Sequence, residues 1–239
     1  MKKIIIILIL IVNTSCTDVN KLVEEIAKVE MMEAEHIGLV GAKSEQYRNF
    51  QKLKSKASNE ELRNLITHKN PILRTYIYLS LIDRKLMKPS DAFKNALRNN
   101  ESFSKMSSDQ IFGTDICTEI YFEIVNFYPN SKREIQQMDS LILYELDENH
   151  FLQYMALKDK KHEEKYNDRI KDLAIDYHNS SAIFYIAENN IEIDKSKFKE
   201  SIKIVMKNRE IGTEPLKELN KILINLEDQI KNKTDANNR

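Results

Sequence analysis

The sequence predicts an all-α protein in which antiparallel helix pairs stack as a short solenoid. Tight turns between antiparallel strands consume glycine and proline, and this chain of 239 residues contains only four of each. Apolar residues recur at helical spacing along most of the chain, and polar capping residues separate one run from the next. Scarce turn formers and many capped amphipathic runs together favour helices joined by short loops.

The N-terminal segment is typical of a bacterial lipoprotein signal peptide. Two lysines form the charged n-region, residues 4–12 form the apolar h-region, and a serine directly precedes Cys16. A bilayer-spanning helix needs about 20 apolar residues, so this run is too short to be a membrane anchor. We therefore expect residues 1–15 to be removed and Cys16 to carry the lipid. Asn13 stands where such signals usually have an aliphatic residue, which leaves an ordinary secretory signal with an incidental cysteine as the alternative.

A tether and an N-terminal helix are expected to occupy residues 16–42. The helix runs from Asp18, a suitable N-cap, to about Glu35, with apolar residues on one face. Gly38 and Gly41 then interrupt the helical pattern. We interpret these two glycines as the hinge between the N-terminal helix and the main body.

The main body, residues 43–230, is expected to be an α-helical repeat-like domain. A capping box begins at Ser58, whose hydroxyl and the Glu61 carboxylate would bond each other's backbone amides. Pro71 falls in the first turn of the next helix, where its missing N–H costs nothing. The expected helices cover residues 43–56, 58–66, 71–85, 89–97, 107–128, 132–146, 149–159, 162–177, 180–189, 195–207 and 213–230.

Two further boundaries complete this outline. Ser107 and Ser108 are expected to cap the long helix that ends near Tyr128. Residues 231–239 are polar, and we expect them to form a flexible tail.

One stretch, residues 58–85, carries a family resemblance. A short helix is followed by Asn-Pro and by a second helix with a Leu-Arg pair, and this arrangement resembles a HEAT-type repeat. The positions that match the repeat pattern are Pro71, Arg74, Ser80 and Leu81. The resemblance implies a structural role for these residues, with Arg74 bonded to a carboxylate or carbonyl of the neighbouring repeat. Ile77 departs from the pattern, because a small residue is usual there.

A wider run, residues 41–71, is similar to lipoproteins of unknown function from Bacteroidetes-type bacteria. That similarity implies an address in the cell envelope and a helical fold, and it implies no activity.

The balance of charged residues does not favour a nucleic-acid partner. The chain has 37 basic and 37 acidic side chains, well mixed, with a formal net charge of zero. Nucleic-acid binding needs clustered lysine and arginine. The expected partners are therefore the membrane, reached through the lipid on Cys16, and an envelope protein of unknown identity.

No motif for catalysis, a cofactor or a metal is found. The glycines are too scattered for a phosphate-binding loop, and His162 begins a zinc-protease-like motif whose second histidine is replaced by Tyr166. Cys117 lies in a run with helical apolar spacing, so we interpret it as a core thiol in preference to a reactive nucleophile. Ser140 lies in an Asp-Ser-Leu triplet, which matches the pattern used for protein O-glycosylation in Bacteroidetes-type bacteria and makes it a candidate for that modification.

These observations predict a membrane-anchored lipoprotein that acts as a helical protein–protein interaction scaffold in the cell envelope and is not an enzyme. The expected location is the outer membrane, facing the periplasm. The aromatic residues are interpreted as core, with some tyrosines on a concave surface as the alternative. Two other functions stay open: an envelope-polymer hydrolase with an active site assembled from distant helices, and an immunity-type lipoprotein that neutralises a toxin.

Overall fold

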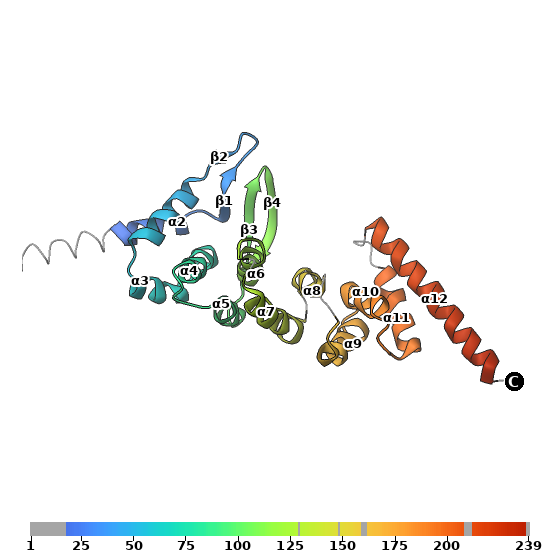
Figure 1. The fold of residues 1–239 in the computed structure, drawn as a ribbon. Coiled ribbons are helices and arrows are strands. Elements are labelled where there is room, and N and C mark those ends of the chain that lie inside the picture. The colour runs from blue at the N-terminus through green and yellow to red at the C-terminus, as the bar shows by residue number, and fades with distance from the viewer. Residues whose placement is uncertain (1–17, 129, 148, 159–161, 208–211, 238–239) are drawn as a thin grey trace, which may run out of the picture. The chain divides into compact units, whose positions relative to one another are not determined.

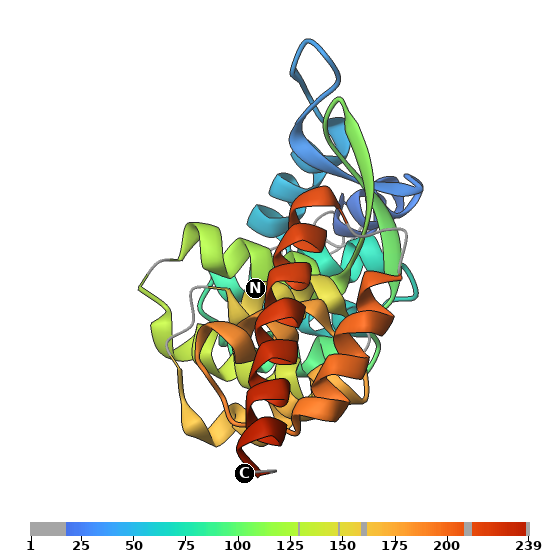
Figure 2. The same ribbon diagram turned by 90° about the vertical axis from the view of Figure 1, so that its right-hand side faces the viewer.

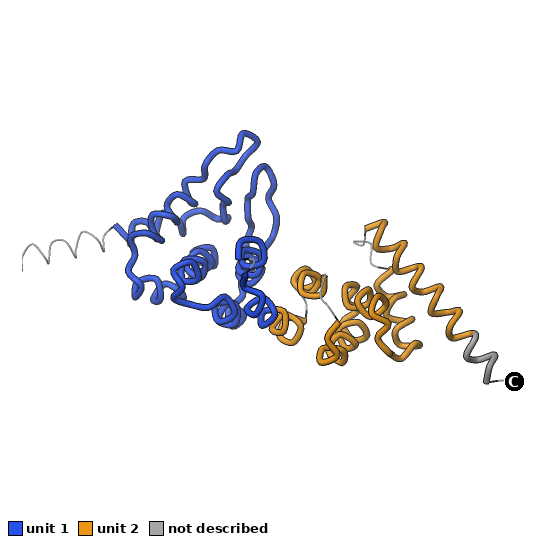
Figure 3. Tube along the Cα trace, in the orientation of Figure 1, with its two compact units in different colours: residues 1–138 blue, residues 139–239 orange. Residues whose placement is uncertain are grey.

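The computed structural model describes residues 18–128, 130–147, 149–158, 162–207 and 212–237. The expected signal peptide and Cys16 lie outside these ranges. The chain divides into two compact units, Met1–Met138 and Asp139–Arg239, which Figure 3 distinguishes by colour. Each unit is described here by itself.

The first unit combines helices with a four-stranded sheet, shown in Figure 1. Residues 18–27 are helical. The elements that follow are β1 (Met31–Ile37), β2 (Ala42–Lys43), α2 (Glu45–Lys56), α3 (Asn59–Asn64), η1 (Leu65–Thr67), α4 (Pro71–Asp83), α5 (Pro89–Leu97), β3 (Ser102–Ser108), β4 (Gln110–Asp115), α6 (Ile116–Phe127) and α7 (Lys132–Glu145). The strand order is β2-β1-β3-β4, with β1 and β3 parallel and the two outer pairs antiparallel.

The predicted all-α class is wrong, because segments expected to be helical form strands. β1 replaces the second half of the helix expected from Asp18 to Glu35, and that helix ends at Ala27. The protein is mostly helical with a mixed sheet in its N-terminal half. The methionine, glutamate and alanine of β1 favour a helix locally, but pairing with β3 outweighs that preference.

The hinge expected at Gly38 and Gly41 is instead the turn of the β1–β2 hairpin. The N–H of Gly41 donates a 3.0 Å hydrogen bond to the carbonyl of Gly38. Both residues have positive φ values, +73° and +64°. Glycine adopts this left-handed conformation without the steric penalty of a Cβ atom, which is why the turn forms here.

The helix expected to start at Ser107 and Ser108 begins only at Ile116. Ser107 pairs with Gln110 across the β3–β4 turn, and Ser108 takes a positive φ of 52° within that turn. The N-cap of α6 is Asp115, whose side chain accepts a 2.8 Å bond from the amide of Thr118. Ser108 therefore adopts the left-handed conformation that a glycine usually takes in such a turn. For this reason the small number of glycines underestimates the number of turns.

The other expected helices of this unit are present. The capping box of α3 is complete, since Ser58 and Glu61 each bond the backbone amide of the other. Pro71 occupies the first turn of α4, and the side chain of Asn70 caps that helix by accepting from Leu73. These local signals survive because each is satisfied within a single turn of the chain.

Helix α4 is the centre of the first unit. Ten of its 13 residues are buried, as expected for a helix that is apolar nearly all round. The ring of Tyr76 stacks on Phe50 of α2 with centroids 4.3 Å apart. One face of the sheet packs toward helices, because Phe103 joins the core around α4 and Thr114 is buried next to α6. The opposite face exposes Ser104 and Gly113.

The second unit is helical throughout its described residues. Besides the end of α7 it contains α8 (His150–Leu157), η2 (Glu164–Tyr166), α9 (Asn167–Ile175), α10 (Ser180–Glu188), α11 (Lys195–Met206) and α12 (Thr213–Asn237). Asn179 and Asp194 are N-caps of α10 and α11, and their side chains accept from first-turn amides. Apolar and aromatic residues of α9, α10 and α11 form most of its core. Helix α12 extends past Ile230, where we had placed the end of the main body.

Candidate functional site

The four residues matched to the repeat pattern all lie on α4 and serve packing. Arg74 is only 4% exposed and donates to the carbonyls of His68 (3.3 Å) and Asn99 (3.2 Å) and to the carboxylate of Glu101 (3.0 Å). Asn99 and Glu101 belong to the connection from α5 to β3, so Arg74 braces the entry to the sheet. Ser80 donates to the carbonyl of Tyr76 at 2.8 Å. Leu81 and Pro71 complete the set as a buried core residue and the helix start.

Ser140 lies within α7, and its hydroxyl is 2.6 Å from the hydroxyl of Tyr166. The neighbouring Asp139 is buried. A glycan attached to Ser140 would break this contact with Tyr166, and its sugar would have to project away from α7 into solvent.

A serine–histidine pair is the nearest approach to catalytic chemistry in the described residues. The hydroxyl of Ser201 is 3.1 Å from Nδ1 of His178, but Ser201 donates its hydrogen to the carbonyl of Ala174. His178 must then act as the donor, whereas a general base needs to accept the nucleophile's proton. Ser201 is also 1% exposed, so this pair fastens α9 to α11.

The described residues contain neither a metal-binding cluster nor a membrane-spanning helix. No group of three or more histidine, cysteine or acidic side chains among them is placed to hold a metal ion. No helix in the described ranges is long and apolar enough to cross a membrane. Cys117 is a buried free thiol in α6, and burial raises its pKa well above the ordinary value, as a core position requires.

The most unusual exposed residues lie at the tip of the β1–β2 hairpin. Leu39 and Val40 occupy the two central positions of the turn and are 90% and 92% exposed. Central turn positions normally carry proline, asparagine, aspartate, serine or glycine. Fully burying one such aliphatic side chain contributes about 1.5–3 kcal/mol. The first unit leaves both side chains exposed, so this stabilisation would be gained only if a partner covered them.

The β3–β4 hairpin adds apolar surface at the same end of the sheet. The N–H of Gly38 donates to the carbonyl of Ser108, which brings the two turns side by side, as Figure 2 shows. Ile111 and Phe112 of β4 are 58% and 43% exposed. We call the set Leu39, Val40, Ile111 and Phe112 the apolar sheet end.

Strand β4 is an open edge of the sheet. It is the outermost strand, and Gln110 to Gly113 are exposed. Because Ser107 and Gln110 close a two-residue turn, they are a hydrogen-bonded pair, and alternate residues face the other way. Ile111 and Gly113 therefore direct their N–H and C=O groups outward. Natural edges are commonly guarded by lysine, proline or a bulge, and β4 contains neither of these residues.

This arrangement can bind an extended peptide. An incoming strand would gain main-chain hydrogen bonds from β4 and would place apolar side chains beside Ile111 or Phe112. Sequence reasoning missed this surface because it assigned both hairpins to helices or a hinge. The sequence signals were a Leu-Val pair bracketed by two glycines and the glycine at position 113 inside an expected helix.

In comparisons with known proteins, no family model matches the chain, and neither a curated protein nor a solved structure shows significant similarity to it.

Proposed function

We propose that this chain is an envelope lipoprotein, anchored through Cys16, that binds an extended segment of a partner protein at β4 and the apolar sheet end. The lipid anchor and its outer-membrane, periplasm-facing location rest on the signal peptide pattern of the sequence. The sequence predicted a protein-binding surface on helices, whereas we now propose that the binding surface is the sheet.

The open edge of β4 carries the proposal. An unguarded edge is a template for any strand that meets it, and a stable secreted or surface protein normally blunts it. Here the edge is six residues long, lacks charge until its last residue, and has exposed apolar side chains on both of its faces. Each added main-chain hydrogen bond contributes about 0.5–1.5 kcal/mol net, so four or five would give a useful affinity when combined with apolar contacts.

The hairpin tip supplies the second half of the contact. Gly38, at the base of this tip, bonds the carbonyl of Ser108 in the β3–β4 turn, so a partner strand that runs past this turn would approach Leu39 and Val40. Two aliphatic side chains are too small a surface to hold a globular partner alone, since stable interfaces bury on the order of 1,200 Å² or more. They are well suited to reinforce a strand already paired with β4.

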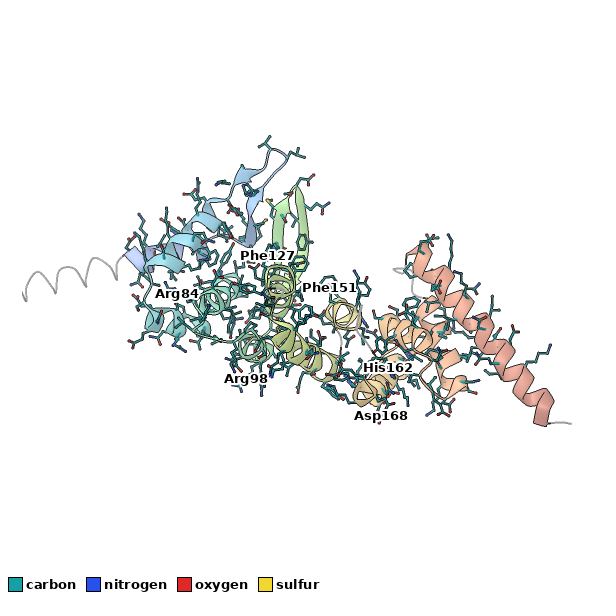
Figure 4. All side chains as sticks on the ribbon, in the orientation of Figure 1. Arg84, Arg98, Phe127, Phe151, His162 and Asp168 are labelled. Atoms are coloured by element: carbon teal, nitrogen blue, oxygen red, sulfur yellow. The ribbon has the colours of Figure 1, made fainter. Side chains whose placement is uncertain are left out.

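Gly113 offers a direct test of strand pairing. A Cβ atom built there meets nothing within 4 Å, so alanine fits, and proline is tolerated where a strand's N–H faces outward. Gly113→Pro removes one outward donor, while Gly113→Ala keeps it. The readout is photo-cross-linking in living cells from a photoreactive amino acid at Val40, with the same probe at Phe127 as control, because Phe127 is 68% exposed at the end of α6 (Figure 4).

We expect Val40 to form one major protein adduct that persists in Gly113→Ala and is lost in Gly113→Pro, with no such adduct from Phe127. Equal melting temperatures of the two variants would show that the fold is intact. The proposal is wrong if the adduct survives Gly113→Pro or if Val40 cross-links only to lipid. Mass spectrometry of the adduct also separates a resident envelope protein from the toxin that an immunity-type lipoprotein would bind.

A further inference from the structure

A pocket in the first unit is lined by residues of α3, α4 and α5, of the α4–α5 connection and of the segment between α6 and α7. It has a volume of about 720 Å³, which is in the range of small-molecule sites. Its lining includes four cationic side chains, Arg63, Lys85, Lys88 and Lys94. Leu86, Met87 and Pro89 contribute apolar surface to the same pocket.

Three of these cationic side chains have no polar partner among the described residues. The side-chain ammonium groups of Lys85, Lys88 and Lys94 make no hydrogen bond or ion pair with any residue that the structure describes, whereas those of Lys54 and Lys105 in the same unit each pair with a carboxylate. Charges of the same sign gathered in a concave site raise its positive potential. An anion is the ligand that such a potential attracts.

The carboxylates of the pocket offset this charge only in part. Two are present, Asp83 and Asp91, against four cations. Asp83 is already engaged, because it accepts from Lys54 at 2.6 Å and from the hydroxyl of Tyr128. Burial raises the pKa of Asp83, but the hydrogen bonds from Lys54 and Tyr128 outweigh this effect, and the pKa lies below its ordinary value. The carboxylate is therefore ionised, and the Lys54 ammonium group balances its charge.

The backbone at Lys85 points the same way. Lys85 follows Arg84, the C-cap of α4, with a positive φ of 57°, and the amide of Leu86 bonds back to the carbonyl of Leu81, which is the hydrogen bond of a Schellman cap. Glycine is the residue that suits this position, since a side chain there carries a steric penalty. The lysine at residue 85 therefore carries a backbone cost that glycine would avoid, while its ammonium group adds a positive charge to the pocket.

We infer that this pocket binds a small anionic ligand, namely a phosphate or carboxylate group attached to an apolar moiety. The lysines would hold the anion, and Leu86 with Met87 would contact the apolar part. This inference does not depend on the proposed strand-binding function.

Isothermal titration of the purified chain with three probes tests the inference: phenyl phosphate, inorganic phosphate and benzyl alcohol. We expect phenyl phosphate to bind at least about tenfold more tightly than either of the others, because it alone satisfies both halves of the pocket. Its affinity should fall as salt is added, since the lysines are exposed and their field is screened. Benzoate in place of phenyl phosphate tells a carboxylate site from a phosphate site.

Lys85→Gly separates a ligand role from a structural one. We expect this variant to melt at a higher temperature and yet bind phenyl phosphate several-fold more weakly. The double variant Lys88→Gln/Lys94→Gln should lose about tenfold or more in affinity, while Lys43→Gln, an exposed lysine on β2, should bind normally. Absence of saturable binding, equal affinity for phenyl phosphate and inorganic phosphate, or unchanged affinity in the double variant would each overturn the inference.

Discussion

The hydroxyl of Tyr76 donates a 2.7 Å hydrogen bond to the backbone carbonyl of Glu33, which joins the central helix α4 to strand β1. The side chain of Gln46 lies 3.1 Å from the same hydroxyl and also accepts from the amide of Glu33 at 2.8 Å. Tyr76 is 1% exposed, and burial raises the pKa of its hydroxyl far above the ordinary value. The hydroxyl therefore keeps its proton, and with it the bond to Glu33, throughout the neutral pH range.

Replacing Tyr76 with phenylalanine should destabilise the first unit by about 1–2 kcal/mol, because a buried acceptor loses its partner while the ring stays in place. Denaturant unfolding followed by circular dichroism measures this loss. Tyr78→Phe is the matched control on the same helix, since its hydroxyl makes no hydrogen bond with a described residue. Equal losses in the two variants would contradict a specific role for the Glu33 contact.

Arg74→Met should cost about 2–4 kcal/mol of unfolding free energy, because a buried guanidinium with three acceptors is removed and its carbonyl partners are left behind. Glu101→Gln removes only the half-exposed end of the network, whose side chain is 47% exposed. Its cost should stay below about 1 kcal/mol. Chemical denaturation of both variants checks this asymmetry, and a large effect confined to Glu101→Gln would reverse our assignment.

Glu123→Gln should stabilise the protein at neutral pH. Burial, followed by repulsion from Asp83, raises the pKa of Glu123 above its ordinary 4.5 despite the opposing effect of Lys105. The folded state therefore binds this proton more tightly than the unfolded chain does, and stability is lost as the pH rises through the raised pKa. The advantage of the variant should shrink as the pH is lowered toward and below 4.5.

Unfolding curves across this pH range test the sign, with Asp83→Asn as the opposite case. The pKa of Asp83 is lowered in the fold, so its ionised form contributes stability that is lost only as the pH falls through that lowered value. Asp83→Asn should accordingly be less stable at neutral pH. A pH-independent difference for Glu123→Gln would refute the role of its charge.

Cys16→Ser should release the chain from the membrane fraction and abolish the mass increase that acylation gives. A single acyl chain holds a protein only marginally, whereas several hold it firmly, so the effect on fractionation should be nearly complete. Cys117→Ser is the control, because that thiol is buried in α6. Membrane retention of Cys16→Ser would favour an ordinary secretory signal.

Local sequence signals predicted the helical part of the fold well. The capping box at Ser58 and the proline at position 71 each mark a helix start that the structure confirms. These signals work because a cap is complete within about four residues and needs no distant partner.

The sheet could not be predicted in the same way. β1 contains residues with good helix propensity and becomes a strand only by pairing with β3, which lies far along the chain. The small number of glycines and prolines also suggested too few turns. Four residues that are not glycine adopt positive φ, namely Lys85, Ser108, His178 and Asn190. The sequence did not indicate the pocket, because its lysines in the α4–α5 connection and in α5 match no motif.

The parallel pairing of β1 with β3 also dictates an order of assembly. All of α2, α3, α4 and α5 intervene between the two strands, so β1 has only the two-residue strand β2 beside it until residues 102–108 have been synthesised. A hairpin that short is not stable alone in water. The helices can therefore gather around α4 first, and the sheet closes late, after the ribosome has passed β3. A chain cut short before that point would leave the strand-forming residues of β1 uncovered and prone to aggregate.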